Sequence, residues 1–200
     1  MASLAAINQV GESLVALLRA RRDLLAAEGR LGPVPPAVEI AHASLARLAT
    51  AALPTAGLTL TPYRVALSEH QTPRASPAPV TLALELHYLL AAWSATGVDE
   101  QALLGWAMLE LAGHPVLDRS LLLGAGVWER DETVQVVLDR QSEDTLFRVW
   151  DVLQHRLRLS VTFRARVIRI GLEPGRDALP VVATRFGYAD ADPLAEGGGG

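Results

Sequence analysis

The most regular pattern in the chain is an alternation of apolar and other side chains over residues 80–91. A period of two predicts a β-strand with one deeply buried face. The apolar face of this strand comprises Leu82, Leu84, Leu86, Tyr88 and Leu90. The opposite face comprises Thr81, Ala83, Glu85, His87 and Leu89. We expect the apolar face to line the core, with Leu146 and Trp150 from a later helix packed nearby.

Residues 58–67 also have a strand-like pattern, but their apolar phase shifts at Pro62. Proline has no N–H to donate to a ladder, so we expect either an edge strand or a bulged strand here. Residues 37–41 and 133–138 predict two short strands.

The last predicted strand covers residues 160–170. One of its faces carries Val161, Phe163, Ala165 and Val167, and the other carries Thr162, Arg164 and Arg166. Since residues two apart on a strand project to the same side, the two arginines should share a face.

Helical spacing of apolar residues predicts an amphipathic helix over residues 3–27, with Ser3 as the N-cap. Residues 44–53 predict a short helix capped by Ser44. The glycines and prolines of residues 29–36 end the first helix, and Pro54 ends the second.

A third helix should run from Val98 to Ala112, with Asp99 as the N-cap and Val98 packed on Leu103. Gly113 and Pro115 end it. A fourth helix is predicted from Ser142, its cap, to about residue 155. Residues 121–131, between these two helices, are predicted to form a loop.

This alternation of helices and strands predicts an α/β fold of mixed α+β type, a single domain with a central mixed sheet flanked by helices. We expect helical crossovers after the strands at residues 80–91 and 133–138. The domain should cover residues 1–172, and residues 173–200, rich in Gly, Pro and Asp, should form a flexible tail. Residues 71–79, with three prolines, are predicted to form a loop.

The composition is that of a globular protein, with 50% hydrophobic and 20% charged residues. Every basic residue is arginine, and the net charge of −4 argues against a general role in nucleic-acid binding. There is no cysteine, which excludes disulfides and thiolate metal ligands. No signal peptide or membrane span is predicted.

The sequence offers no catalytic, cofactor-binding or metal-binding constellation. The five histidines lack ligand spacing, and His114 with Asp118 at a helix end reads as a cap or a surface pair. Gly124 and Gly126 form a lone GxG, which is typical of a turn. A hydrolase that uses scattered His and Asp residues is the enzymatic alternative.

Two features are candidates for protein interfaces. Trp128 lies in a predicted loop, unlike the other three tryptophans, and either packs locally or docks on a partner. Residues 156–169 contain five arginines and no acid, including Arg164, Arg166 and Arg169. They form either a solvated outer face or a surface that pairs with carboxylates of a neighbouring subunit. Nucleic-acid binding is the third interpretation. The aromatic residues that a stacking platform for single strands needs do not alternate with these arginines.

Three segments carry a resemblance to a known family. They are residues 84–94 (LELHYLLAAWS), residues 100–108 (EQALLGWAM) continued by 114–117 (HPVL), and residues 146–150 (LFRVW) followed by 158–161 (RLSV). Over residues 3–172 the chain resembles the cap, or tail-terminator, proteins of contractile injection systems of the antifeeding-prophage and virulence-cassette type.

The resemblance implies a tail-terminator-like fold and a structural, non-enzymatic function without a cofactor. Such caps form a ring, commonly sixfold, at the end of a phage tail-like particle distal to the baseplate. The implied partners are further copies of the chain in a homohexamer, the inner tube protein and the sheath protein, with no nucleic acid and no membrane. The implied location is cytoplasmic. The alternative is a non-enzymatic adaptor or protein-binding module of another assembly.

Overall fold

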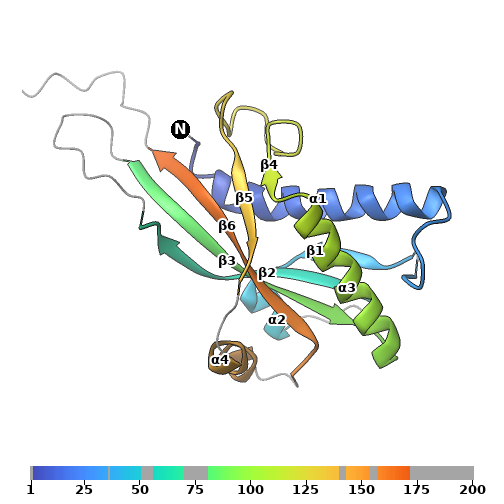
Figure 1. Cartoon of the computed structure of the whole chain (residues 1–200). Helices are drawn as coiled ribbons and strands as arrows, with labels where there is room; N and C mark the ends of the chain where they lie inside the picture. The colour runs from blue at the N-terminus through green and yellow to red at the C-terminus, as the bar shows by residue number, and fades with distance from the viewer. Residues whose placement is uncertain are drawn as a thin grey trace, which may run out of the picture.

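Six strands form one sheet in the described part of the chain, in the order β1-β2-β3-β6-β5-β4 (Figure 1). The computed structural model describes residues 2–35, 37–50, 56–69, 81–139, 143–153 and 157–171. Its elements are α1 (Ala6–Ala27), β1 (Glu39–His42), α2 (Leu45–Thr50), β2 (Gly57–Leu67), β3 (Thr81–Trp93), α3 (Gly97–Gly113), β4 (Val116–Leu117), β5 (Val134–Leu138), α4 (Glu143–Leu153) and β6 (Ser160–Gly171). The predicted loop at residues 71–79 and tail at residues 173–200 lie outside the described residues, so the boundary at residue 172 stays a prediction.

The sheet is mixed, as predicted. β1 and β2 pair in parallel, and the other neighbouring strands pair antiparallel. The single-domain α+β class is therefore confirmed, but the crossovers lie elsewhere than expected. The parallel pair is β1 and β2, with α2 between them in the chain. The helices that follow β3 and β5 are not parallel crossovers, because β6 returns antiparallel beside β5 and β4 is not a neighbour of β3.

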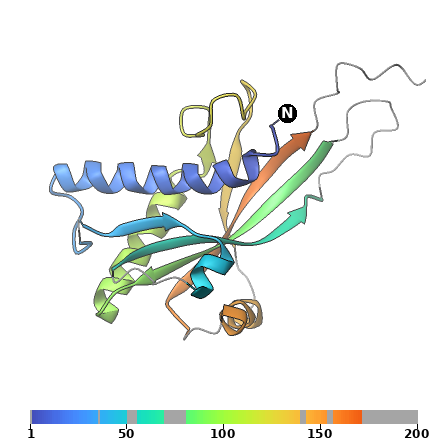
Figure 2. The same ribbon diagram turned by 180° about the vertical axis from the view of Figure 1, so that it is seen from behind.

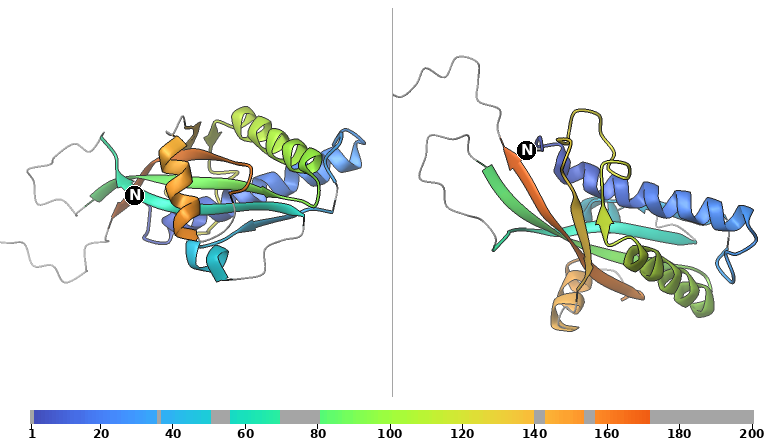
Figure 3. Two further views of the ribbon diagram at one scale, coloured as in Figure 1. Left: turned by 90° about the horizontal axis from the view of Figure 1, so that it is seen from below. Right: turned by 45° about the horizontal axis from the view of Figure 1, so that its top comes forward.

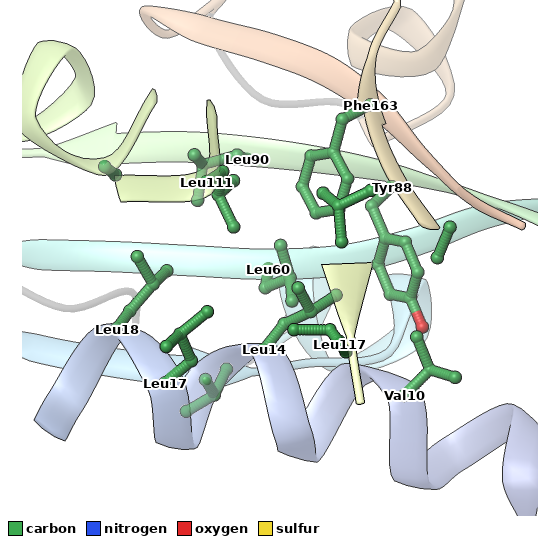
Figure 4. Packing of buried hydrophobic residues seen from close by; sticks show 14 of the residues in the cluster. Val10, Leu14, Leu17, Leu18, Leu60, Tyr88, Leu90, Leu111, Leu117 and Phe163 are labelled. Carbon is green, nitrogen blue, oxygen red and sulfur yellow. The ribbon is translucent and has the colours of Figure 1, made fainter. Parts of the chain in front are cut away.

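One face of the sheet, here called the inner face, is covered by α1 and α3 (Figures 1 and 2). As predicted, Leu84, Leu86, Tyr88 and Leu90 of β3 line it, and each is at most 5% exposed. Figure 4 shows that α1 side chains point toward these strands from successive helical turns. The contributing residues of α1 include Val10, Leu14, Leu17 and Leu18.

The opposite face, here called the outer face, is crossed by α4, with α2 beside it (Figure 3, left). Leu89, Ala91 and Trp93 of β3 are fully buried there against Trp150 of α4 and Leu48 of α2. Trp93 and Trp150 meet edge to face at 6.1 Å. Two expectations were therefore wrong: β3 is buried on both faces, and Trp150 and Leu146 pack opposite Leu86 rather than near it. Leu82, at the start of β3, is 38% exposed.

The helix caps correct two predictions. α1 begins at Ala6 and its N-cap is Ala5, not Ser3. The N-cap of α3 is Thr96, whose hydroxyl accepts a hydrogen bond of 3.2 Å from the Asp99 backbone N–H. Val98 is consequently inside the helix and 73% exposed, so it forms no hydrophobic staple. Ser44 caps α2 as predicted, accepting from the Arg47 backbone N–H.

Two irregularities redirect side chains between the faces. The register between β2 and β3 shifts between Pro62 and Arg64, which confirms the predicted bulge. β1 pairs with β2 over Gly57–Leu60, so β2 is not an edge strand there. In β6, Ala165 pairs with Leu86 but Ile168 pairs with Leu84, one residue more than a regular ladder has. The buried inner side of β6 therefore passes from Phe163 and Ala165 to Ile168 and Ile170.

Candidate assembly interface

Arg164, predicted to face a partner, is held inside its own chain. On the outer face its Nη1 lies 3.3 Å from Glu85 Oε2, and its Nε lies 3.1 Å from Asp139 Oδ2. The second contact is an ion pair, close enough for attraction but not aligned as a hydrogen bond. The side chain of Arg164 is 30% exposed and that of Glu85 is 12% exposed. The guanidinium therefore compensates two carboxylates that the sheet has largely removed from water.

His87 and Tyr63 complete this polar cluster. Their rings meet edge to face, with centroids 5.9 Å apart. His87 Nδ1 lies 4.0 Å from Asp139 Oδ2. Burial lowers the pKa of His87, and the guanidinium groups of Arg64 and Arg164 lower it further. Burial raises the pKa of Tyr63, and the Asp139 carboxylate adds to that rise. The cluster is arranged to keep both rings neutral near pH 7 while Arg164 carries the positive charge.

The other predicted arginines divide into two groups. Arg158 lies over the Trp93 ring at 5.5 Å and bonds Glu100 at 3.1 Å, so it too serves its own chain. Arg156 lies outside the described residues. Arg166 and Arg169 form no ion pair with another described residue; Arg166 is partly exposed and Arg169 is exposed. These two retain the property on which the interface hypothesis rested.

Arg166 and Arg169 have different surroundings. Arg166 pairs in register with Gln135 of β5, two residues from Arg164 on the same face. Arg169 lines a small polar hollow of about 100 Å³ together with Asp131 and Glu132. Acidic side chains of the same molecule therefore lie near Arg169, whereas Arg166 projects from the middle of the sheet.

Trp128 is not the exposed aromatic residue that its loop position suggested. It is 7% exposed, belongs to the inner core, and donates a hydrogen bond of 2.6 Å from Nε1 to the Leu123 carbonyl. Local packing accounts for it, as for Trp93, Trp106 and Trp150, which are all at most 9% exposed. Of the two alternatives for Trp128, the structure favours local packing.

Sequence reasoning missed the pairing of Glu85, Asp139 and Arg164, although it placed Glu85 and His87 opposite the apolar face of their strand. The partners Arg164 and Glu85 are 79 residues apart in the chain. The usable signal was that two predicted strands each carried charges on a face that should pack in the sheet. Among the described residues, no three His, Asp or Glu side chains are placed to hold a metal ion.

The comparison that decides the family is a match of residues 9–184 to the model of the Pvc16 N-terminal domain. The chain belongs to the Pvc16 N-terminal domain family. This match covers most of the chain and confirms the family resemblance drawn from its three sequence segments.

Two solved structures resemble this member of the Pvc16 N-terminal domain family. One is the sheath/tube terminator, in the extended state, of an extracellular contractile injection system termed PVC, with 19% identity and a TM-score of 0.49 over 88% of this chain. The other is the tube terminating cap of the anti-feeding prophage, with 17% identity and a TM-score of 0.49 over 80% of this chain. The chain spans 64% and 58% of those two proteins, less than two thirds of either.

No curated protein matches the chain significantly. None of the helices in the described part of the chain has the length and apolar character needed to cross a membrane.

Proposed function

We propose that this protein is a structural cap, or tail terminator, of a phage tail-like contractile injection system. The observation that carries the proposal is its membership of the Pvc16 N-terminal domain family over residues 9–184. In this role it ends the inner tube and the sheath at the end distal to the baseplate. It works by binding rather than by chemistry, without a cofactor, and is made and assembled in the cytoplasm.

The proposed assembly is a homohexameric ring. A cap has to match the symmetry of the tube it ends, and a head-to-tail contact repeated by rotation closes into a ring. Arg166 and Arg169 on β6 are the arginines that we assign to contacts with acidic groups of a neighbouring subunit or the tube. Partly exposed charges of this kind add little affinity but set orientation and salt sensitivity.

The test is to assemble particles with and without this protein, together with the tube, sheath and baseplate proteins of its own system. Electron microscopy should show particles of uniform length with a sixfold density at one end, and overlong or open particles when the protein is omitted. A cap density of another symmetry would contradict the hexamer. Normal particles without the protein would instead favour an adaptor of another assembly.

The arginine assignment is tested with the double change Arg166→Glu and Arg169→Glu. Circular dichroism should show an intact fold, because neither side chain has an ion pair to lose within the described residues. Capping should be impaired, and added salt should partly restore it because salt screens the introduced repulsion. The matched control is Arg30→Glu, an exposed arginine just beyond the end of α1, which should cap normally. Normal capping by the double variant would return Arg166 and Arg169 to ordinary solvated surface.

A further inference from the structure

Among the described strands, β1 covers only the first part of one edge of β2. β1 pairs with Gly57–Leu60, and β3 pairs with the whole length of β2 on the other side. From Thr61 to Leu67, no described strand lies along the edge opposite β3. An uncovered edge presents backbone N–H and C=O groups that another extended chain can pair with.

The bulge in β2 gives this open edge an unusual outer surface. Before the bulge Thr61 pairs with Leu89 on the outer face, and after it Arg64 pairs with His87 on the same face. Tyr63, between them, packs against the outer apolar cluster. The extra residue of the bulge therefore places two adjacent side chains, Tyr63 and Arg64, on the outer face of the strand.

A groove of about 370 Å³ lies beside these two residues and is lined by side chains of β2, α2 and α4. Its apolar lining comes from Leu45, Tyr63, Val149 and Val152. Val152 is 78% exposed, so its side chain contributes little to the fold as described. The hollow has room for an apolar side chain from outside.

Each wall of this groove contributes an arginine: Arg64 comes from β2 and Arg148 comes from α4. Both are exposed, and neither forms an ion pair with another described residue. They differ in this from Arg164, which is neutralised by Glu85 and Asp139. On a chain with a net charge of −4, two arginines that have no ion pair with a described residue and lie beside one apolar hollow form a local site for a carboxylate.

We propose that the open edge of β2 and the adjoining groove bind an extended, acidic and apolar segment of a partner protein. The segment adds as a strand along Thr61–Leu67, places an apolar side chain in the groove, and presents a carboxylate to Arg64 and Arg148. In strand addition, backbone hydrogen bonds supply affinity and pockets for alternate side chains supply specificity. The inference rests on the proposed function in one respect, that the partner is another component of the assembly.

The first test uses the purified full-length chain and a fluorescein-labelled peptide of about eight residues, the usual reach of a strand, that alternates Val and Glu. Fluorescence anisotropy should detect binding of this peptide but not of a Val/Lys peptide of the same length. The double change Arg64→Glu and Arg148→Glu should raise Kd by about tenfold or more, because it replaces attraction with repulsion. Arg130→Glu is the matched control and should leave Kd unchanged. Equal binding of the two peptides, or an unchanged Kd in the double variant, overturns the proposal.

The second test separates strand addition from mere attraction to arginines. Hydrogen exchange of the peptide-bound protein should show slower exchange of amides within Thr61–Leu67 than in the free protein. Val152→Gln, which fills the groove mouth with a larger uncharged side chain and does not touch the core, should weaken binding of the Val/Glu peptide while circular dichroism stays unchanged. Binding without protection of these amides would overturn the strand-addition mode.

The occupant is tested by sedimentation of the same proteins without peptide. If the wild type self-associates and the Arg64→Glu, Arg148→Glu variant is monomeric, the edge belongs to a second copy, and the proposal of an acidic partner segment fails. These measurements need no particle. A failure here therefore leaves the capping assay untouched, and uncapped particles with normal peptide binding would count against the proposed function alone.

Discussion

The inner and outer faces of the sheet differ in what fills them. The inner face is apolar along β3 and β6 and is covered by the full length of α1 and by α3. The outer face carries a small apolar cluster around Trp150, then the charged cluster of Glu85, Asp139 and Arg164, and then the open groove beside α4. The same strands thus have one face that is closely packed by helices and another that keeps an open groove.

This difference follows from how much of each face the helices cover. α1 has 22 residues and spans several strands, whereas α4 has 11 residues and α2 has six. On the outer face, individual side-chain hydrogen bonds satisfy the buried polar groups of the two tryptophans. Trp93 Nε1 donates to Thr59 at 2.9 Å, and Trp150 Nε1 donates to Ser160 at 3.1 Å. The helices leave part of this face open, and Arg64 on β2 and Val152 near the end of α4 are exposed there.

The largest expected effect comes from the centre of the inner face. Leu86→Ala should lower the free energy of unfolding by about 2–5 kcal/mol, because Leu86 is fully buried and its removal leaves a cavity. Urea unfolding followed by circular dichroism measures the change. A loss below about 1 kcal/mol would mean that the inner face does not carry the stability of the domain.

The next effect concerns the charged cluster of the outer face. Arg164→Ala should cost about 1–3 kcal/mol, since it leaves the largely buried Glu85 and Asp139 carboxylates without their cation. The control Arg166→Ala, on the same strand and face, should change stability by no more than about 0.5 kcal/mol. If both variants lose the same small amount, Arg164 is a surface residue and the distinction between the two arginines is wrong.

A smaller effect should appear as a pH dependence from His87. Its pKa is lowered in the folded protein, mainly by burial, from the ordinary value near 6.5 that it has in the unfolded chain. As pH falls through about 6.5, the unfolded chain takes up a proton that the folded protein refuses, so stability falls and then levels off below the folded-state pKa. Urea unfolding between pH 8 and pH 5 should show a steeper loss in the wild type than in His87→Gln. Parallel profiles would show that His87 is not kept neutral by its surroundings.

The smallest effect is expected in the groove. Val152→Ser should change the free energy of unfolding by no more than about 0.5 kcal/mol, because the side chain is already 78% exposed. The same urea experiment measures it. A loss above about 1 kcal/mol would show that Val152 supports the fold, and the contrast between the two faces would then be weaker than described.

Much of the fold was predictable because it depends on local periodicity. The alternation in β3, the apolar stripe of α1 and the Pro62 bulge in β2 are all visible in short windows of sequence. The N-caps of α1 and α3 were less predictable from the sequence. Thr96 and Asp99 are both good capping residues, and only the backbone conformation shows that Thr96 is the one at the N-cap.

The interface candidates were less predictable because they depend on partners far away in the chain. The residues near Arg164 in the sequence do not predict that Glu85, 79 residues earlier, lies beside it. The same holds for Trp150, whose helical stripe predicts burial but not the side of the sheet on which it packs. Arg64 and Arg148, on separate elements, come together at one groove only in the folded chain.

The place of β6 in the sheet constrains when the domain can fold during synthesis. β6 is the last described strand of the chain, yet it lies inside the sheet between β3 and β5. The segment before α1 also depends on β6, because the Ala2 N–H donates a hydrogen bond of 2.9 Å to the Arg169 carbonyl. A ribosome that has not yet made β6 therefore holds a chain in which one edge of the apolar strand β3 is unpaired, a state prone to aggregation. The surface that carries Arg166 and Arg169 is completed in the same event as the core, so an unfinished chain cannot join an assembly through it.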